Sequence, residues 1–170
     1  LQETIMNGVN SAQTGDVAIP CEQEAGAYDG LHGRDWGKRY VDVDLGEQHA
    51  RLYDDQGSLV WESDVVTGTP DGEHDTPEGI YVINGKESPS KLIGQMEPET
   101  GEPEYKTEVK TWMPFVENYI GFHDAEWQSA FGGSRYSSGY GSHGCVNLPP
   151  DKSVELYDLI EVGDVVVSHW

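Results

Sequence analysis

The first regular pattern along the chain is an alternation of apolar and polar residues over 40–45, in which two valines and a leucine alternate with two aspartates. Alternation with a period of two is typical of a strand that buries one of its faces. We predict further strands over 49–53 and 59–66, and the turn 54–57 between them contains a glycine. Two strands joined by such a turn favour an antiparallel hairpin.

Strand-like stretches recur through the rest of the chain, and one segment has the pattern of a helix. The helix is predicted over 149–160, because two prolines and Asp151 suit its start and Gly163 suits its end. The further strands are expected over 80–83, 111–115, 119–123 and 165–167. The pattern predicts a mostly β fold with one or two short helices packed against it.

Residues 86–110 interrupt this pattern. They contain few apolar residues, three prolines and many charges. A loop of this length inside a compact domain is usually functional or mobile. We expect a lid or a substrate-facing excursion here, and a passive surface insertion is the alternative.

The N-terminal residues 1–35 have little periodicity and many glycine-containing turn signals. We predict that they form an irregular leader or interdomain linker, and that 36–170 form one domain with a single hydrophobic core. No stretch approaches the roughly 20 consecutive apolar residues of a membrane span, so we expect no membrane contact within this sequence. The first residues do not resemble a signal peptide and Leu1 is not an initiator methionine, so an export signal or membrane anchor is expected to lie outside this sequence.

The chain is strongly acidic, with a net charge of -21 from 10 basic and 31 acidic residues. A nucleic-acid partner is not expected, because binding a phosphate backbone depends on a basic face. Adhesion to anionic lipid is disfavoured for the same reason. The simplest explanation of the charge is a soluble, self-repelling surface, and adaptation to an ionic environment is the alternative.

The densest group of chemically active residues is the segment 141–147, Gly-Ser-His-Gly-Cys-Val-Asn. It combines the thiol of Cys145 with the imidazole of His143 and the hydroxyl of Ser142. A nearby imidazole can lower the pKa of a thiol below its usual value of about 8.5 and so make it a nucleophile. Consecutive backbone N–H groups around a glycine turn can bind an oxyanion. The segment therefore predicts an acyl-transfer enzyme with Cys145 as its nucleophile.

A second histidine, His123, is predicted at the end of a strand and is followed by Asp124. A base needs only to be close to the nucleophile in space, so His123 is a candidate general base. Two other interpretations remain open: Cys145 as a small buried apolar residue, and a zinc site of His123, His143 and Cys145, although a Cys-x-x-Cys pair is absent. The other cysteine, Cys21, lies in the leader, and we expect separate roles for the two cysteines rather than a disulfide.

The segment 123–147 resembles the signature of the L,D-transpeptidases, or YkuD-type domains. That signature is a histidine, a spacer, then Ser/Thr-His-Gly-Cys, an apolar residue and Asn or Arg. Here the spacer is 124–141, at the long end of the family's range. Thr-Pro-Glu-Gly at 76–79 and Val-Val-Thr-Gly at 65–68 resemble two further family segments, and Trp-Met-Pro-Phe at 112–115 resembles the Gram-positive type.

The resemblance covers about residues 38–170 and implies a β-sandwich-like catalytic fold that acts on peptidoglycan stem peptides. It implies that Cys145 attacks the carbonyl of the third residue of a donor stem tetrapeptide and expels the terminal D-Ala. The side-chain amine of an acceptor stem would resolve the thioester into a 3→3 cross-link, whereas water would make the enzyme an L,D-carboxypeptidase. The resemblance implies no cofactor and no metal. It also implies inhibition by carbapenem β-lactams and an extracellular, cell-wall location.

The resemblance also assigns roles to individual residues. His123 is expected to be the general base, oriented by the carbonyl or the carboxylate of Asp124, and an exchange of roles with His143 is the alternative. His143 is expected at the mouth of the site, and the backbone N–H groups of Gly144 and Cys145 are expected to bind the oxyanion. Substrate-binding or bracing roles are expected for Ser142, Asn147, Trp112 and Met113.

Two rival functions belong to other classes. A catalytically degenerate peptidoglycan-binding module would keep the fold but lose Cys145 or His123, and both are present. A general cysteine peptidase would accept ordinary L-peptides, whereas a transpeptidase of this family should need a D-residue on the leaving side.

Overall fold

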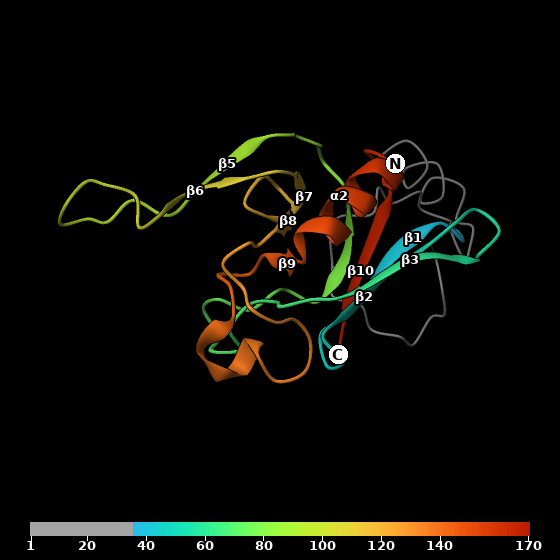
Figure 1. The fold of residues 1–170 in the computed structure, drawn as a ribbon, viewed down its shortest axis with the longest axis horizontal. Helices are drawn as coiled ribbons and strands as arrows, with labels where there is room; N and C mark the ends of the chain where they lie inside the picture. The colour runs from blue at the N-terminus through green and yellow to red at the C-terminus, as the bar shows by residue number, and fades with distance from the viewer. Residues whose placement is uncertain (1–35) are drawn as a thin grey trace, which may run out of the picture.

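The computed structural model describes residues 36–170, so the predicted leader at 1–35 and its Cys21 lie outside the described part of the chain. The described residues form a five-stranded, a three-stranded and a two-stranded sheet (Figure 1). The prediction of a mostly β fold is confirmed. Within residues 36–170, no helix is long and apolar enough to cross a membrane.

The five-stranded sheet has the strand order β3-β2-β1-β10-β4. Its strands are β1 (Tyr40–Asp44), β2 (His49–Tyr53), β3 (Leu59–Asp64), β4 (Gly79–Val82) and β10 (Val165–His169). The β1 and β10 strands pair in parallel, and all other neighbours in this sheet are antiparallel. The predicted hairpin is confirmed as β2 and β3, which leaves β3 as one edge of the sheet.

The three-stranded sheet has the order β7-β8-β9 and positions the residues with chemistry. Its strands are β7 (Trp112–Val116), β8 (Ile120–Asp124) and β9 (Val146–Leu148). Successive side chains point to opposite faces of a sheet. One face, with Met113, Phe122 and Val146, joins residues of the five-stranded sheet in the main core. Helix α2 (Pro150–Leu159) adds Leu156 to the same core.

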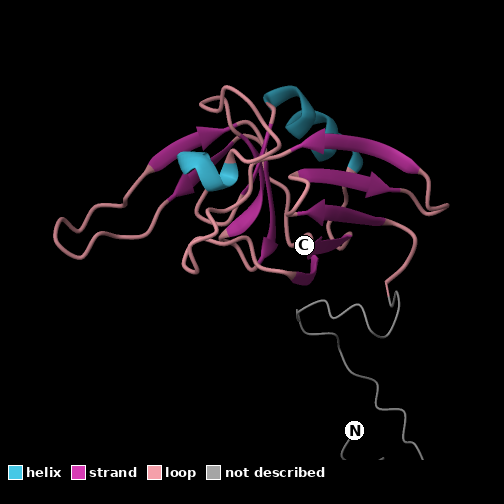
Figure 2. Ribbon diagram, turned by 90° about the horizontal axis from the view of Figure 1, so that it is seen from below, coloured by secondary structure: helices cyan, strands magenta, loops and turns pink. Residues whose placement is uncertain are grey.

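Residues 86–110, expected as a long loop that forms a lid or a substrate-facing excursion, contain two strands. Strands β5 (Ser90–Ile93) and β6 (Lys106–Val109) form an antiparallel hairpin that extends away from the body of the domain (Figures 1 and 2). One face of the hairpin is exposed and the other is only partly buried, and most of its positions are polar, so the strands leave little apolar alternation in the sequence. The short strand β9 and the π-helical turn η1 (Tyr136–Tyr140) were also not predicted.

Candidate active site

The pairing of three strands places the predicted nucleophile and base on one face of the smaller sheet. Cys145 directly precedes β9, whose Asn147 pairs with His123 of β8. Residues two apart on an extended chain share a face, so Cys145, Asn147 and His123 lie on the same side. On the other side of β8, Trp112 of β7 also pairs with His123. Trp112 packs with Cys145 in a small cluster that is separate from the main core.

The thiol of Cys145 is buried and lies against the turn between β7 and β8. Its Sγ is 3.6 Å from the carbonyl oxygen of Tyr119, and the backbone N–H of Gly121 also approaches it. Burial raises the pKa of Cys145 to about 11, and the smaller effect of the Gly121 N–H lowers it. Burial thus opposes the lowered thiol pKa that was expected from a nearby imidazole, and it favours the neutral form of Cys145.

The imidazole of His123 is buried and held in one tautomer. Its Nδ1 is 2.9 Å from the backbone carbonyl oxygen of Asp124. Because a carbonyl can only accept, we assign the proton to Nδ1, which leaves Nε2 as an acceptor. Desolvation lowers the pKa of His123, against an opposing effect of the Asp124 carbonyl. The rings of Trp112 and Trp127 lie 6.0 and 5.8 Å away, so this imidazole stands in aromatic surroundings.

The carboxylate of Asp124 has a separate task. It accepts hydrogen bonds from the backbone N–H groups of Lys110 and Thr111, at 2.6 and 3.1 Å. These residues connect the β5–β6 hairpin to β7. Of the two orienting groups expected for His123, the carbonyl contacts the ring, and the carboxylate fixes the base of the hairpin.

The two reactive groups do not touch in the resting structure. Within the described chain, Cys145 and His123 form no hydrogen bond with each other. Catalytic hydrogen bonds are often long or unformed before substrate binds. Residues 36–170 also contain no group of three or more His, Cys, Asp or Glu side chains placed to hold a metal ion.

Side-chain hydroxyls brace the turn that carries the thiol. Gly144 has a φ of 110°, a conformation that L side chains rarely adopt. Its N–H donates to Ser142 Oγ at 3.0 Å, and this hydroxyl donates to the Cys145 carbonyl at 2.6 Å. Thr76 Oγ1 accepts the N–H of Gly68 at 2.9 Å and donates to the Gly144 carbonyl at 2.7 Å. The Gly144 N–H, expected to bind an oxyanion, is thus occupied by Ser142.

His143, which was expected at the mouth of the site, has 46% of its side chain exposed. Its Nε2 is 3.3 Å from Glu104 Oε1, and its ring stacks on Tyr105 with centroids 5.6 Å apart. The ring of His74 meets it edge-on at 4.6 Å. Burial is the main cause that raises the pKa of Tyr105. The segment after β5 therefore packs against His143.

Comparison with known proteins identifies the domain that carries this geometry. The L,D-transpeptidase catalytic domain family, YkuD, matches residues 38–167. The chain belongs to this family. A comparison with curated proteins gives no match.

Solved structures of L,D-transpeptidases share the fold. The chain is 36% identical to a mutant L,D-transpeptidase from Enterococcus faecium, with a TM-score of 0.68, covering 77% of this chain and 49% of that one. For the Ldtfm–avibactam carbamoyl enzyme the identity is 36%, the TM-score 0.71, and the coverage 79% and 50%. For the isolated E. faecium catalytic domain the identity is 35%, the TM-score 0.66, and the coverage 80% and 100%. The chain thus spans about half of the first two proteins.

The other predicted residues of this L,D-transpeptidase domain differ in their access to the site. Met113 is fully buried in the main core, because it follows Trp112 along β7 and so faces away from Cys145. It contributes packing rather than substrate contact. Asn147 is buried too, and its backbone exchanges hydrogen bonds of 2.9 and 3.0 Å with Val66.

One bracing residue of the L,D-transpeptidase site was missed. The segment 76–79 resembles a family segment, but its sequence predicts no role for Thr76. Its hydroxyl contacts Gly144 across 68 positions of sequence. No local pattern reports a contact over such a separation, so only the family-like Thr-Pro-x-Gly segment could have indicated it.

Proposed function

We propose that this domain is a peptidoglycan L,D-transpeptidase that forms 3→3 cross-links through a thioester on Cys145. The observation that carries the proposal is the buried thiol on one sheet face with a neutral imidazole, whose Nδ1 is held by a backbone carbonyl. Family membership and the E. faecium L,D-transpeptidase at 36% identity support the reaction class.

In the first half of the reaction, His123 acts as base and then as acid. Its Nε2 takes the thiol proton as Sγ bonds to the carbonyl carbon of the third residue of the donor stem. The backbone N–H of Cys145 stabilises the oxyanion, since the N–H of Gly144 is occupied by Ser142. Protonated His123 then gives its proton to the amine of the departing D-Ala, and a thioester remains.

In the second half, the side-chain amine of an acceptor stem attacks the thioester carbonyl. His123 takes a proton from this amine, and the proton passes to the sulfur as the C–S bond breaks. Cys145 returns to a neutral thiol and a 3→3 cross-link is formed. If water attacks the thioester carbonyl instead, the same proton transfers release the hydrolysed donor, and the enzyme acts as an L,D-carboxypeptidase.

Two neutral groups at rest suit a buried site. A thiolate–imidazolium pair would require two charges to be desolvated beside Trp112. Burial instead raises the pKa of Cys145 and lowers the pKa of His123, so each is held in its neutral form. Proton transfer then coincides with attack on the substrate carbonyl.

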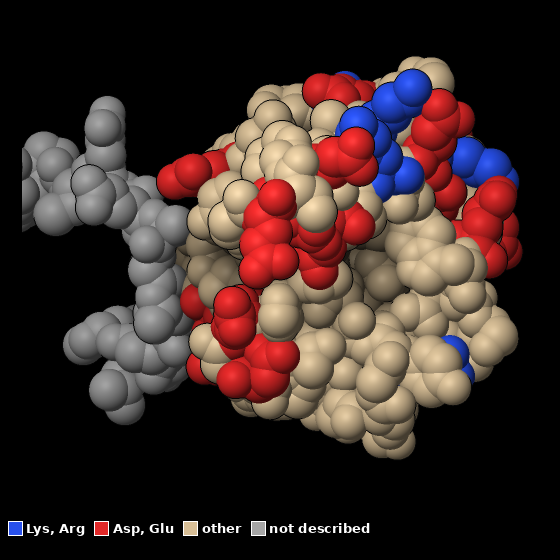
Figure 3. Space-filling view, turned by 90° about the vertical axis from the view of Figure 1, so that its left-hand side faces the viewer, with Lys and Arg blue, Asp and Glu red and all other residues tan. Residues whose placement is uncertain are grey.

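The surface charge is compatible with a cationic acceptor. Acidic side chains gather over the left-hand and central parts of the face in Figure 3, whereas Lys and Arg stand among acidic side chains in its upper right-hand part. This view looks at the end of the molecule where the β5–β6 hairpin extends. Carboxylates raise the local concentration of ammonium groups, and Glu104 stands beside His143 at the mouth.

Carbapenems are proposed as covalent inhibitors of this domain. The catalytic domain of the E. faecium L,D-transpeptidase, 35% identical to this chain, has a structure acylated by ertapenem. By analogy, Cys145 opens the β-lactam ring. The proposed site of action is the extracellular cell wall, where the stem peptides are found.

Mass spectrometry of products tests the function. Purified stem tetrapeptides, incubated with the protein, should give a dimer whose mass equals two tetrapeptides minus one D-Ala, and tandem spectra should place the link between the third residues. The Cys145→Ala variant should give no dimer and no ertapenem adduct, while Cys145→Ser controls for the shape of the side chain.

The rival functions predict other products. A degenerate binding module would bind stem peptides without releasing D-Ala or forming an adduct. A general cysteine peptidase would cleave a matched tetrapeptide that ends in L-Ala as fast as the natural donor. Either result would overturn the proposal.

A further inference from the structure

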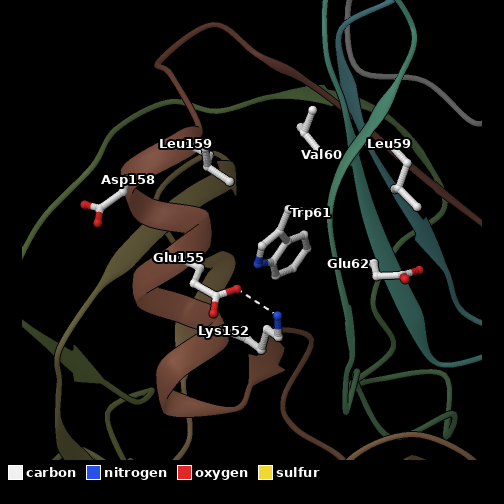
Figure 4. A pocket seen from close by; sticks show the side chains of 8 residues that line it. All are labelled: Leu59, Val60, Trp61, Glu62, Lys152, Glu155, Asp158 and Leu159. Carbon is white, nitrogen blue, oxygen red and sulfur yellow. Dashed lines mark hydrogen bonds and ion pairs between the residues drawn. The ribbon is translucent and has the colours of Figure 1, made fainter.

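We propose that the groove between edge strand β3 and helix α2 is a docking site for a basic, extended segment of a partner protein, which adds a strand to β3. The groove has a volume of about 560 Å³ and lies open between residues 59–62 and the helix (Figure 4). None of its lining residues belongs to the thiol site, so the inference does not depend on the proposed function.

The edge of β3 offers a row of backbone groups. β3 is the last strand of the five-stranded sheet and pairs with β2 alone in that sheet. Its far end is covered, because Ser63 Oγ donates to the Asp64 carbonyl and the Gly132 N–H donates to the Val65 carbonyl. The open length is 59–62, the part that lines the groove. Exposed edges of this kind are templates for strand addition.

Trp61 forms the floor of the groove and leaves one donor without a partner. It is 4% exposed, and its indole Nε1 has no hydrogen-bond partner within residues 36–170. Figure 4 shows the indole between the strand and the helix, with its nitrogen turned towards α2. A buried donor without an acceptor is costly. This unpaired donor marks the floor beneath the open edge where an added strand would lie.

The rim combines apolar contacts with negative charge. Leu59, Val60 and Leu159 are 46%, 44% and 43% exposed and stand on opposite sides of the groove. The charged lining residues are Glu62, Glu155, Asp158 and Lys152. The single lysine is already paired, with Nζ 2.7 Å from Glu155. The excess of carboxylates selects basic side chains next to apolar ones.

Charge also distinguishes a partner protein from two other possible occupants of the groove, which are a second copy of this chain and its own N-terminal segment. A second copy would bring a net charge of -21 and would place its own Glu62 and Asp64 against the same acidic rim. The N-terminal segment 1–35 is acidic too, with six acidic residues and one basic residue: Glu3, Asp16, Glu22, Glu24, Asp29, Asp35 and Arg34. Both occupants would be repelled. A basic polypeptide is therefore the occupant that fits.

The test uses a capped heptapeptide in which lysine and valine alternate, added to the isotope-labelled full chain. Amide NMR spectra should shift at 59–62, together with the indole N–H of Trp61. The same peptide with glutamate in place of lysine should not bind. A version with N-methylated valines, which cannot pair along its backbone, should also not bind.

Charge reversal provides matched variants. Glu62→Lys with Asp158→Lys should weaken peptide binding about tenfold or more, because two favourable charge contacts become repulsive. Glu97→Lys with Glu102→Lys, which makes the same charge change on the hairpin, should leave the affinity unchanged. Ertapenem acylation should be the same in both double variants, which shows that each one folds.

Other results would overturn the inference. Absence of shifts at millimolar peptide, or shifts confined to other surfaces, would exclude the groove. Equal binding of the N-methylated peptide would exclude strand addition, and equal binding of the glutamate peptide would exclude a basic partner. Concentration-dependent β3 shifts without peptide, with a dimer in sedimentation, would assign the edge to a second copy.

Discussion

The two histidines of the site stand in contrasting regions of one small domain. His123 lies in β8, whose five residues are all buried, and its Nδ1 is held by a backbone carbonyl. His143 lies on a loop, about half exposed, and its contacts are the side chains of Glu104, Tyr105 and His74. One ring is fixed by the sheet, and the other depends on groups that can change rotamer.

This difference indicates how the site divides its work. A general base must hold one tautomer and one orientation relative to the nucleophile, and a backbone partner within a sheet provides both. A residue at the entrance meets substrates of varied shape, and side-chain contacts allow adjustment. The arrangement favours His123 as base and His143 as an entrance residue. The alternative to be tested is that the two histidines exchange these roles.

The largest expected effect comes from replacing the two histidines in turn. His123→Gln should lower kcat/KM for tetrapeptide exchange about 1000-fold, since it removes the proton acceptor. His143→Gln should lower it less than about tenfold, because it removes exposed contacts. The measurement is steady-state kinetics of D-Ala release, with unfolding curves to show that both variants fold. A larger loss in His143→Gln would reverse the assignment.

The next effect is on the reactivity of the resting thiol. With its pKa raised to about 11, Cys145 should be alkylated by iodoacetamide roughly 100-fold more slowly at about pH 8 than a free cysteine of pKa about 8.5. The rate should keep rising with pH beyond the range in which free cysteine levels off, because the thiolate forms only as pH approaches the higher pKa. His123→Gln should not change this profile, since the ring does not contact the resting thiol.

The hairpin provides matched controls for the burial of the thiol. Leu92 packs on the cluster of Val109, Trp112 and Cys145, whereas its neighbour Ile93 is 63% exposed. Leu92→Ala should admit water and raise the alkylation rate severalfold, and Ile93→Ala should leave it unchanged. If the wild-type profile instead follows that of a thiol with a lowered pKa, the neutral resting state is wrong.

The difference between buried and exposed regions also explains how much of the fold could be predicted from the sequence. Strands β1, β2, β8 and β10 bury at least one face, so their apolar residues stand at regular spacing or in short runs. The β5–β6 hairpin buries little and contains polar residues at most positions, so it resembled a loop. β9 has only three residues, too few to show a period.

The site followed a similar rule. The Ser-His-Gly-Cys segment and the upstream His123 are visible because their chemistry depends on residue type. The protonation states of Cys145 and His123 could not be predicted from the sequence, because burial by residues distant in sequence raises the pKa of Cys145. The sequence predicts Asp124 as the residue that orients His123. Only the structure shows that the backbone carbonyl of Asp124 contacts the ring, whereas its carboxylate binds elsewhere.

A smaller effect is expected from Asp124→Asn, which tests whether the carbonyl or the carboxylate of Asp124 orients His123. The amide oxygen can still accept from Lys110 and Thr111, but a neutral acceptor is weaker, so the free energy of unfolding should fall by roughly 1–2 kcal/mol. The kcat should change little, because the carbonyl that orients His123 is retained. Urea unfolding and D-Ala release kinetics measure the two quantities. A fall in kcat as large as that of His123→Gln, without loss of stability, would assign the orienting role to the carboxylate.

The smallest effect is expected from Glu104→Gln, which removes the carboxylate beside His143. Their atoms are 3.3 Å apart and both side chains are nearly half exposed, and such a pair contributes roughly 0.2–1 kcal/mol. KM for the acceptor stem should rise by at most about fivefold, by the same estimate, and kcat should be unchanged. Glu102→Gln, which removes the same charge nearby without an ion pair to His143, is the control. Salt should reduce the wild-type advantage, because exposed pairs are screened. An equal change in both variants would show that overall negative charge, rather than the contact with His143, sets the affinity for the acceptor amine.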